Sequence, residues 1–445
     1  MRMAHGQTAP TTVQSSLTRL TPGRAAPRVP HIARPRQSED GARPAGPPPA
    51  ASATFLGEIP LWPGMTGSAQ GTPARRPGSI RRTTSVMMER PQGLTGPLHL
   101  VSTGRDLLTT TAGEAVVVGE ARLRVVLDYM AAPGGVLEIE SEPPVPALAD
   151  LVGASTRSGF RAAARRALTA PAGDLGGGDA ATPATDRSLL GQLLDDVPVA
   201  VLVSGAALGR NGIFREGAAV NAGAGSGGNP MIDVCAGWQQ GGLLARLSAE
   251  RRANPGTPGN PGTPVRAVSV PAGDLALGDD PLGWHPLPPM PPNAMRRLRR
   301  IDVVPVSPGP AGGGPTDGEA TRGAATDGAA VGAVSAVEVE ALFRDSFLEA
   351  PGREVLVHEY GVEAEVDSAG LISRARARAG ALPGRECPQA LGSADRLVGL
   401  PAAELRRTVG RAFVGTSTCT HLNDTFRTLG DLPDLITFLG GTADR

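Results

Sequence analysis

The 445-residue sequence contains no lysine, and all 43 of its basic side chains are arginine. Mechanisms that need a lysine amine are therefore excluded, including a pyridoxal Schiff base and the phosphate-binding lysine of a P-loop. Aromatic residues make up only 3 % of the chain, and the formal net charge is zero. Because nucleic-acid binding normally uses a basic face and stacking rings, we expect no nucleic-acid partner. No nucleotide or pyridoxal cofactor is expected either.

Long apolar runs and cysteine pairs are also missing. No run of 18 or more apolar residues is present, and no apolar segment follows the N-terminal charges. This pattern predicts neither a membrane span nor a signal peptide. The three cysteines, Cys235, Cys387 and Cys419, are too few and odd in number for a disulfide-built secreted domain. We therefore expect a cytoplasmic protein whose partner is another protein or a small molecule, and not a membrane.

Glycine and proline are plentiful, at 60 and 43 residues, and they cluster in a few stretches. Their distribution predicts a disordered tail at residues 1–75 and an intervening segment with a Pro/Gly-rich loop at 201–295. Two regions with regular hydrophobic patterns remain, 76–200 and 296–445. The second is interrupted by a flexible insert at 307–335.

These two regions resemble each other. Arg105–Asp128 aligns without a gap with Arg344–Asp367, and after one insertion Glu140–Gly153 aligns with Glu386–Gly399. Each copy has strands with a period of two followed by about three helical patterns. The sequence therefore predicts an α+β protein of two duplicated halves, each an antiparallel sheet covered by about three helices.

Four side chains in the second half are of the kinds that bind soft metals: His358, Cys387, Cys419 and His421. His358 is expected in a strand. Each cysteine is expected where a helix begins, with Cys387 as a helix N-cap, and backbone N–H groups there favour the thiolate. The sequence thus predicts a metal or thiolate site in the second half.

The first half is a natural control for this site. Its alignment places Gly119 opposite His358 and Ser141 opposite Cys387, and no cysteine or histidine stands where Cys419 and His421 do. One copy therefore lacks every candidate ligand, as expected for a structural half beside a working half.

The chemistry of the site is left open by the spacing. No C-x-x-C or H-E-x-x-H motif is present, so Cys387 and Cys419 could instead be half-buried small residues and His358 a surface residue of its strand. Four ligands would form a closed tetrahedral shell for Zn or Fe, and three would leave an open position. One alternative is an acyl transferase or hydrolase with a cysteine nucleophile and a histidine base. Another is a non-catalytic interaction module.

Some further residues are interpreted as structural and not as part of a functional site. The arginines between Arg296 and Arg300 are expected on a solvated face, and Asp424 near the start of a helix, where it complements the dipole. Cys235 is expected in a buried strand. Trp284 and His285, in the Pro-rich segment at 281–292, are expected to pack against the domain.

The motifs "VHEY", "GRECPQALGSADRLVG" and "CTHLND" resemble the domain-of-unknown-function 2889 family, DUF2889. The resemblance is expected to cover residues 76–445, with its motifs in the last 100 residues. By this resemblance, the family's histidine in the strand, its cysteine before the first helix and its "CTHL" element match His358, Cys387, Cys419 and His421. It implies no reaction.

A looser likeness is to iron–sulfur scaffold proteins of the NifU/SufE type. Their order of sheet, Cys-led helix and final Cys-led helix implies that His358, Cys387 and Cys419 occupy the ligand positions. A histidine in place of a cysteine favours zinc or a single iron over a cluster.

Overall fold

The computed structural model describes the following parts of the chain, with isolated short stretches between them: residues 71–130, 134–156, 159–169, 184–211, 231–253, 280–306, 336–350 and 352–440. All of them lie in one compact unit, Glu58–Arg445. The predicted insert at 307–335 and nearly all of the predicted tail lie outside the described residues.

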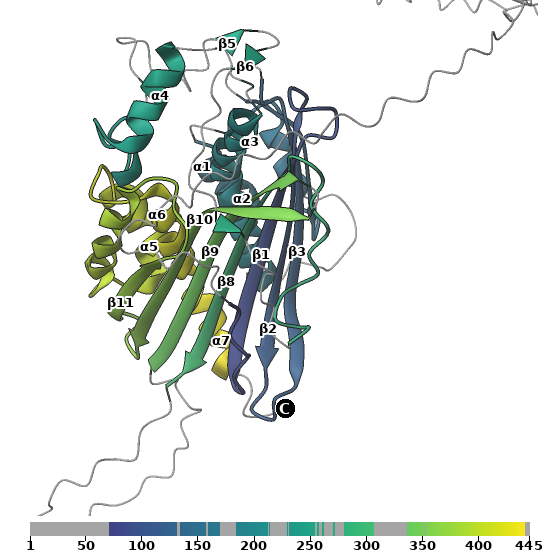
Figure 1. Ribbon diagram of the computed structural model, residues 1–445. Helices are drawn as coiled ribbons and strands as arrows, with labels where there is room; N and C mark the ends of the chain where they lie inside the picture. The colour runs from purple at the N-terminus through teal and green to yellow at the C-terminus, as the bar shows by residue number, and fades with distance from the viewer. Residues whose placement is uncertain are drawn as a thin grey trace, which may run out of the picture. The chain divides into compact units, whose positions relative to one another are not determined.

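Eight strands form one antiparallel sheet in the order β11-β10-β9-β8-β1-β2-β3-β4 (Figure 1). Their bounds are β1 Ser79–Glu89, β2 Leu98–Thr109, β3 Ala115–Leu127, β4 Val136–Glu142, β8 Met295–Pro305, β9 Ala336–Ala350, β10 Arg353–Asp367 and β11 Ile372–Ala379. The short β7 (Val270–Pro271) pairs with β10, and β5 (Gly256–Thr257) pairs with β6 (Asn260–Pro261).

The two predicted sheets are in fact one sheet. β1 pairs with β8 along nearly its whole length, from Ile80 opposite Val303 to Met88 opposite Met295. Each of these strands is buried on both faces, so neither can end a sheet in contact with water. Pairing them satisfies both backbones and joins the two halves.

The helices are short and follow the strands of each half. After β4 come η1 Pro146–Leu151, α1 Phe160–Thr169, α2 Ala184–Val203 and α3 Gly205–Arg210, then η2 Ala236–Trp238 and α4 Leu243–Ala253. After β11 come η3 Cys387–Leu397, η4 Ala402–Glu404, α5 Leu405–Ala412, α6 Thr420–Thr428, η5 Leu429–Asp431 and α7 Leu432–Gly440. The three helical patterns predicted for the second half are present, although the first of them is a 3-10 helix.

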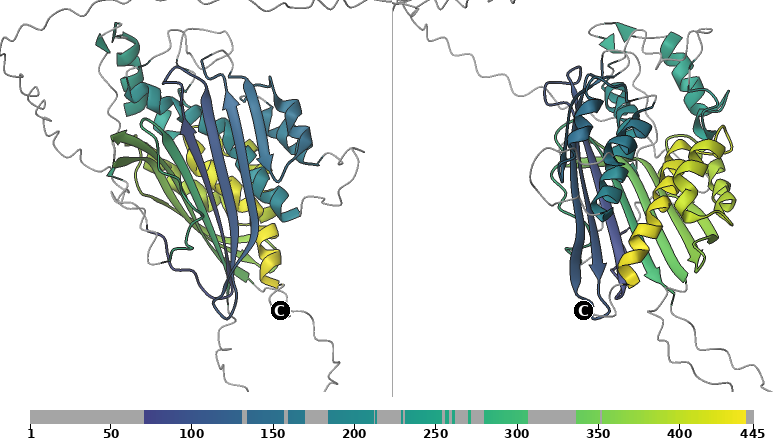
Figure 2. Two further views of the ribbon diagram at one scale, coloured as in Figure 1. Left: turned by 90° about the vertical axis from the view of Figure 1, so that its right-hand side faces the viewer. Right: turned by 180° about the vertical axis from the view of Figure 1, so that it is seen from behind.

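The helices of both halves cover one face of the sheet, which is called the inner face below (Figure 2). Two hydrophobic cores lie between them. One gathers side chains of β1–β4, α1 and α2, and the other gathers side chains of β8–β11, η3, α5, α6 and α7. In β10, the alternation of the sequence "VEAEV" sends valines inward and glutamates outward, as the period of two predicts.

The outer face of the central strands is covered by the Pro-rich segment at 281–292. Trp284 and His285 are buried there, at 4 % and 2 % exposure. His285 lies between the hydroxyls of Thr83 and Ser85, at 2.9 and 2.8 Å. The prediction that this segment packs against the domain is confirmed.

One helical stretch, Ser188–Arg210, is long and apolar enough to cross a membrane by length and composition alone. The sequence predicted no such stretch. In the structure 56 % of its most apolar window is buried inside the protein, and Leu189 and Leu193 belong to the core over β1–β4. This is the behaviour of a core helix.

Candidate metal centre

The arginines of β8 are buried, which contradicts the predicted solvated face. Arg296, Arg297, Arg299 and Arg300 are between 1 % and 6 % exposed. Because the strand is central, alternate arginines enter the two faces of the sheet. Arg297 and Arg299 point inward and pair with Asp345 and Asp196, while Arg300 points outward and pairs with Glu340.

Beside Arg297, three elements bring an aspartate and two histidines together. β9 and β10 are in register so that Asp345 lies opposite His358. His421 comes from the first turn of α6, which packs on both strands. One ligand atom from each of Asp345, His358 and His421 lies within 4.8 Å of the other two, and no other such group of three is found among the described residues.

The separations in this triad are short. Nδ1 of His358 is 3.4 Å from Oδ2 of Asp345, and Nε2 of His421 is 3.9 Å from the same oxygen. The two imidazole rings stack with their centroids 3.7 Å apart and their planes 23° from parallel. The side chains are 11 %, 0 % and 15 % exposed for His358, Asp345 and His421, so the triad is almost closed to water.

The protonation states of the triad suit cation binding. Burial by itself raises the pKa of Asp345, but the charge of Arg297 holds that pKa well below its usual range. Burial, and then the neighbouring His358, lower the pKa of His421 well below 6.5. The group therefore offers one carboxylate and one neutral imidazole at physiological pH.

The residues present fit a transition-metal ion. Two imidazoles and a carboxylate are a common donor set for zinc and for iron. With bonds of about 2.0–2.1 Å, two ligand atoms at a tetrahedral angle are about 3.3 Å apart, which the 3.4 Å separation matches and the 3.9 Å separation approaches. An imidazole nitrogen binds in the plane of its ring, so the two stacked rings must turn relative to each other for both to reach one ion. Nδ1 of His358 is buried and, apart from its 3.4 Å contact with Asp345, has no hydrogen-bond partner within the described residues. A buried nitrogen with so long a contact is in place to bind a ligand.

Neither of the two predicted cysteines belongs to this group of three. Cys419 lies at the start of α6, as predicted, and is itself the N-cap; its sulfur is 4.0 Å from Nδ1 of His421. Cys387 is the first residue of η3, and Glu386, not Cys387, is the N-cap. The sequence signal placed both cysteines correctly at helix starts.

The predicted thiolates are also corrected by the structure. Burial raises the pKa of Cys387 and of Cys419, and the backbone N–H groups at the start of α6 offset only part of that effect. Cys235 lies close enough to raise both pKa values further. It precedes η2 and does not lie in a strand, and all three thiols are free and buried.

Asp424 is not a solvated helix-dipole residue. It is 8 % exposed and lies between Arg161, at 3.5 Å, and Arg297, at 3.9 Å. Its raised pKa follows from burial, which those two cations only partly offset. Asp424 therefore belongs to the charged surroundings of Arg297.

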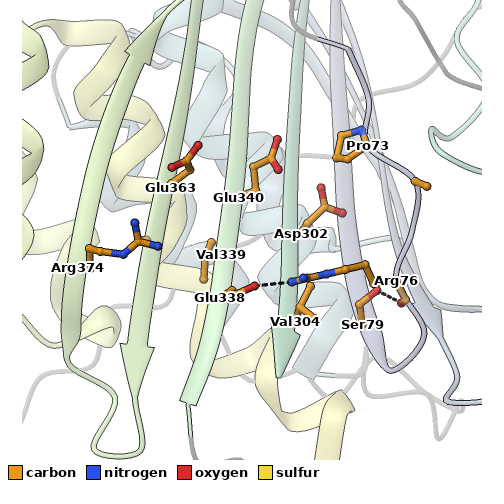
Figure 3. Close-up of a pocket in the computed structure, with 12 residues that line it drawn as sticks. Pro73, Arg76, Ser79, Asp302, Val304, Glu338, Val339, Glu340, Glu363 and Arg374 are labelled. Atoms are coloured by element: carbon orange, nitrogen blue, oxygen red, sulfur yellow. Dashed lines mark hydrogen bonds and ion pairs between the residues drawn. The ribbon is translucent and has the colours of Figure 1, made fainter. Parts of the chain in front are cut away.

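A hollow of about 370 Å³ lies on the outer face of β8–β11 (Figure 3). It is lined by Asp302, Glu338, Glu340 and Glu363 together with arginines. Arg76 pairs with Glu338 at 2.7 Å, and Glu340 is paired with Arg300. Because its carboxylates are neutralised within the chain, this hollow is a weaker candidate than the triad.

Residues 321–433 match the model of DUF2889, described as a protein family of unknown function. The match contains Asp345, His358 and His421, and it covers the C-terminal part of the chain, not the whole of residues 76–445. No curated protein and no solved structure matches the chain.

Proposed function

We propose a function from the geometry of the site, because residues 321–433 match DUF2889, a family defined without an activity. We propose that Asp345, His358 and His421 bind a zinc or iron ion. The observation that carries this proposal is the convergence of three donor atoms within 4.8 Å in a nearly closed part of the core. Three protein ligands leave one position of a tetrahedral shell open, and the low exposure of all three side chains leaves room there for a small ligand such as water.

Cys419 has a different role in this proposal from the one that the sequence suggested. The sulfur faces Nδ1 of His421, while Nε2 faces Asp345. One imidazole cannot present both nitrogens to the same ion. We therefore propose that Cys419 contacts Nδ1–H and so keeps the Nε2 lone pair free, as outer partners of metal-binding histidines commonly do. Cys387 is left as a core thiol outside the shell.

The metal content of the purified full-length protein tests the proposal. Elemental analysis after loading with Zn²⁺ or Fe²⁺ is expected to give about one ion per chain, and the H358A and H421A variants are expected to lose it. H99A is the matched control, because His99 lies on β2 in the other half. A wild-type protein that takes up neither ion at stoichiometric level contradicts the proposal.

Cobalt substitution separates the triad from the four-ligand shell that includes the cysteines. A Co²⁺ ion bound by thiolate has a strong sulfur-to-metal absorption band, and a triad of nitrogen and oxygen ligands has none. The C419S variant is expected to keep the ion with about 10–100-fold weaker affinity, the usual effect of losing an outer partner. A strong thiolate band in the wild type that disappears in C419S assigns Cys419 to the shell.

A cysteine-dependent acyl transferase or hydrolase is the second candidate. The 4.0 Å contact between Cys419 and His421 is what favours it. The buried thiol and its raised pKa count against it, since the nucleophile in such enzymes is an accessible thiolate. The metal site is therefore the better supported of the two. A role as an interaction module is compatible with either.

We further propose that the two halves descend from one duplicated unit. Several matched features support it. Arg82 donates hydrogen bonds from Nε and Nη2 to the two carboxylate oxygens of Asp106. Arg297 donates the same two hydrogen bonds to Asp345. Asp106 lies opposite Gly119 on the next strand, as Asp345 lies opposite His358.

The edges of the halves match as well. Val136, at the start of β4, exchanges backbone hydrogen bonds with Gly153 and Ala154. Ile372, at the start of β11, exchanges them with Gly399 and Leu400. Gly153 and Gly399 both have φ near +80°. The sheet order also reads the same outward from the β1–β8 pair in both directions.

The same features revise one part of the alignment. Ser141 lies on β4 opposite Leu123, whereas Cys387 follows β11 and begins η3. These two residues are therefore not equivalent positions, and Cys387 lies in an insertion that the second half has and the first lacks. The pairing of Gly119 with His358 is retained, so one half keeps the aspartate without the histidine.

We also propose a reducing compartment, such as the cytoplasm. Three cysteines are few and odd in number for a secreted domain, in which cysteines are typically paired in disulfides.

A further inference from the structure

The two edges of the sheet, β4 and β11, carry opposite charges on their outer faces. Three glutamates project from the outer face of β4: Glu138, Glu140 and Glu142. Three arginines project from the outer face of β11: Arg374, Arg376 and Arg378. All six side chains are at least partly exposed.

Charge alternates from strand to strand toward each edge. The acidic β4 is preceded by Arg122 and Arg124 on β3, and each of these arginines pairs with a glutamate of β4. The basic β11 is preceded by Glu363 and Glu365 on β10 (Figure 3 shows Glu363 and Arg374 on the same face). Placing the β4 edge of one sheet beside the β11 edge of another therefore continues the alternation. The glutamates of β4 then lie between the arginines of β3 and of β11, and the arginines of β11 lie between the glutamates of β4 and of β10.

Both edges have free backbone along most of their length. At one end of each strand a loop occupies the edge, at Val136 for β4 and at Ile372 for β11. Beyond these residues, no strand among the described parts of the chain pairs with the outer side of β4 or β11. An unpaired edge of this kind is a template for the addition of another strand.

The directions of the two edge strands also agree. Every neighbouring pair in the eight-strand sheet is antiparallel, so the strands at its two ends run in opposite directions. A second copy shifted sideways by one sheet width thus brings its β11 antiparallel to β4 of the first copy.

We propose that β4 of one copy of this chain pairs with β11 of a second copy, with Glu140 opposite Arg376. This register also places Glu142 opposite Arg374 and Glu138 opposite Arg378. The two occupied ends, Val136 and Ile372, then fall at opposite ends of the pairing, so neither loop obstructs it. The result is a sheet that runs continuously from one copy into the next.

Charge selects this arrangement over symmetric ones. Two β4 edges place glutamates opposite glutamates, and two β11 edges place arginines opposite arginines, which is destabilising for directly opposed residues. A contact between different edges is heterologous, so it leads to a ring or to an open filament. The strands add only a short pairing, so a weak contact in the range of about 10–100 µM is expected.

Sedimentation of the full-length protein over a range of concentrations tests the proposal. The wild type is expected to form species larger than a monomer as its concentration rises, and less of them in high salt. E140R and R376E are each expected to weaken association at least about tenfold, because each places like charges opposite one another. E114R, in the exposed turn between β2 and β3, makes the same change in charge away from both edges and is the matched control.

The E140R/R376E double variant tests the register. It exchanges the two charges, so it is expected to regain association that both single variants lose. A wild type that stays monomeric up to about 100 µM overturns the proposal, given the affinity expected of such a contact. So does association that is unchanged in E140R and R376E, or a double variant that stays monomeric when both single variants do. The metal proposal is untouched by any of these results, because neither edge contains a triad residue.

Discussion

Arg297 donates two hydrogen bonds to the carboxylate of Asp345, at 2.8 and 3.0 Å, and this pair holds the aspartate beside the two histidines. The same arrangement occurs in the other half between Arg82 and Asp106, where Gly119 and not a histidine lies opposite the aspartate. Both aspartates are fully buried. The protein therefore contains its own control for separating the structural role of the ion pair from a role in metal binding.

The first prediction compares D345N with D106N. Each variant leaves a buried arginine without its bidentate partner, so each is expected to lower the free energy of unfolding by about 3–5 kcal/mol. Only D345N is expected to lose bound Zn²⁺ or Fe²⁺. Urea titration measures the stability, and elemental analysis measures the metal. Loss of metal in both variants, or in neither, contradicts Asp345 as a ligand.

A second prediction concerns the reactivity of the thiols. Because burial raises the pKa of Cys387 and Cys419, the folded protein at pH 7 is expected to react with iodoacetamide at least about 100-fold more slowly than the urea-unfolded chain. Mass spectrometry of the folded protein over time gives the rate for each cysteine. A fast reaction at Cys419 that slows in H421A would instead favour the cysteine-enzyme candidate.

Much of the fold could be predicted because its signals are local. The period of two in β10, the glycine turn before β11 and the helix starts at Pro388 and Cys419 all depend on neighbouring residues. What local signals could not show is that β1 and β8 pair. That pairing depends on two strands more than 200 residues apart, each buried on both faces.

The candidate site was found only in part for the same reason. His358 and His421 stood out because histidine is a common metal ligand and can be recognised from the sequence alone. Asp345 was missed, although an Arg-Asp pair at the centre of a strand occurs in both halves, as Arg105-Asp106 and Arg344-Asp345. A charged dipeptide inside a buried strand of both halves was the available signal.

The arginines of β8 were misjudged because their partners are distant in the sequence. A run of "RRLRR" is typical of a solvated surface, and only the tertiary structure supplies Asp345 and Asp196 for its inward side chains. Asp196 comes from α2 in the first half. In return, Arg82 of the first half contacts Asp431 of the second, at 3.0 Å. An aspartate of each half thus pairs with a buried arginine on a central strand of the other half.

A third prediction follows from His285. Burial lowers the pKa of His285 to about 3, from an ordinary value of 6.5. Between those pH values the unfolded chain binds a proton that the folded protein does not, so stability falls as the pH falls, by up to about 1.4 kcal/mol per pH unit from this residue. The H285N variant lacks this contribution. The stability difference between wild type and H285N is therefore expected to shrink from pH 7 to pH 4.

Urea unfolding at several pH values measures that difference. W284F is the matched control, since Trp284 is the buried neighbour of His285 and does not titrate. The effect of W284F is expected to be the same at each pH. A gap between wild type and H285N that stays constant or widens on acidification would show that His285 is not held neutral by the fold.

A fourth prediction concerns the close approach of Gly380 to Glu359. A Cβ at position 380 would lie 2.2 Å from Oε1 and 3.0 Å from Cβ of Glu359. That glutamate is fully buried and pairs with the buried Arg344 at 2.6 Å, so it has little room to move. G380A is therefore expected to cost about 2–4 kcal/mol, the range for overpacking that also disturbs a buried ion pair.

Gly392 provides the comparison for this variant. It lies in η3, and a Cβ there meets nothing within 4 Å. G392A is expected to be neutral or to stabilise the protein by up to about 0.5 kcal/mol, because alanine reduces the freedom of the unfolded chain. Urea midpoints of the two variants, measured side by side, decide the matter. If G380A unfolds at the same midpoint as G392A, Glu359 must have room to rearrange. In that case the buried ion pair of Arg344 and Glu359 is not held rigidly in place.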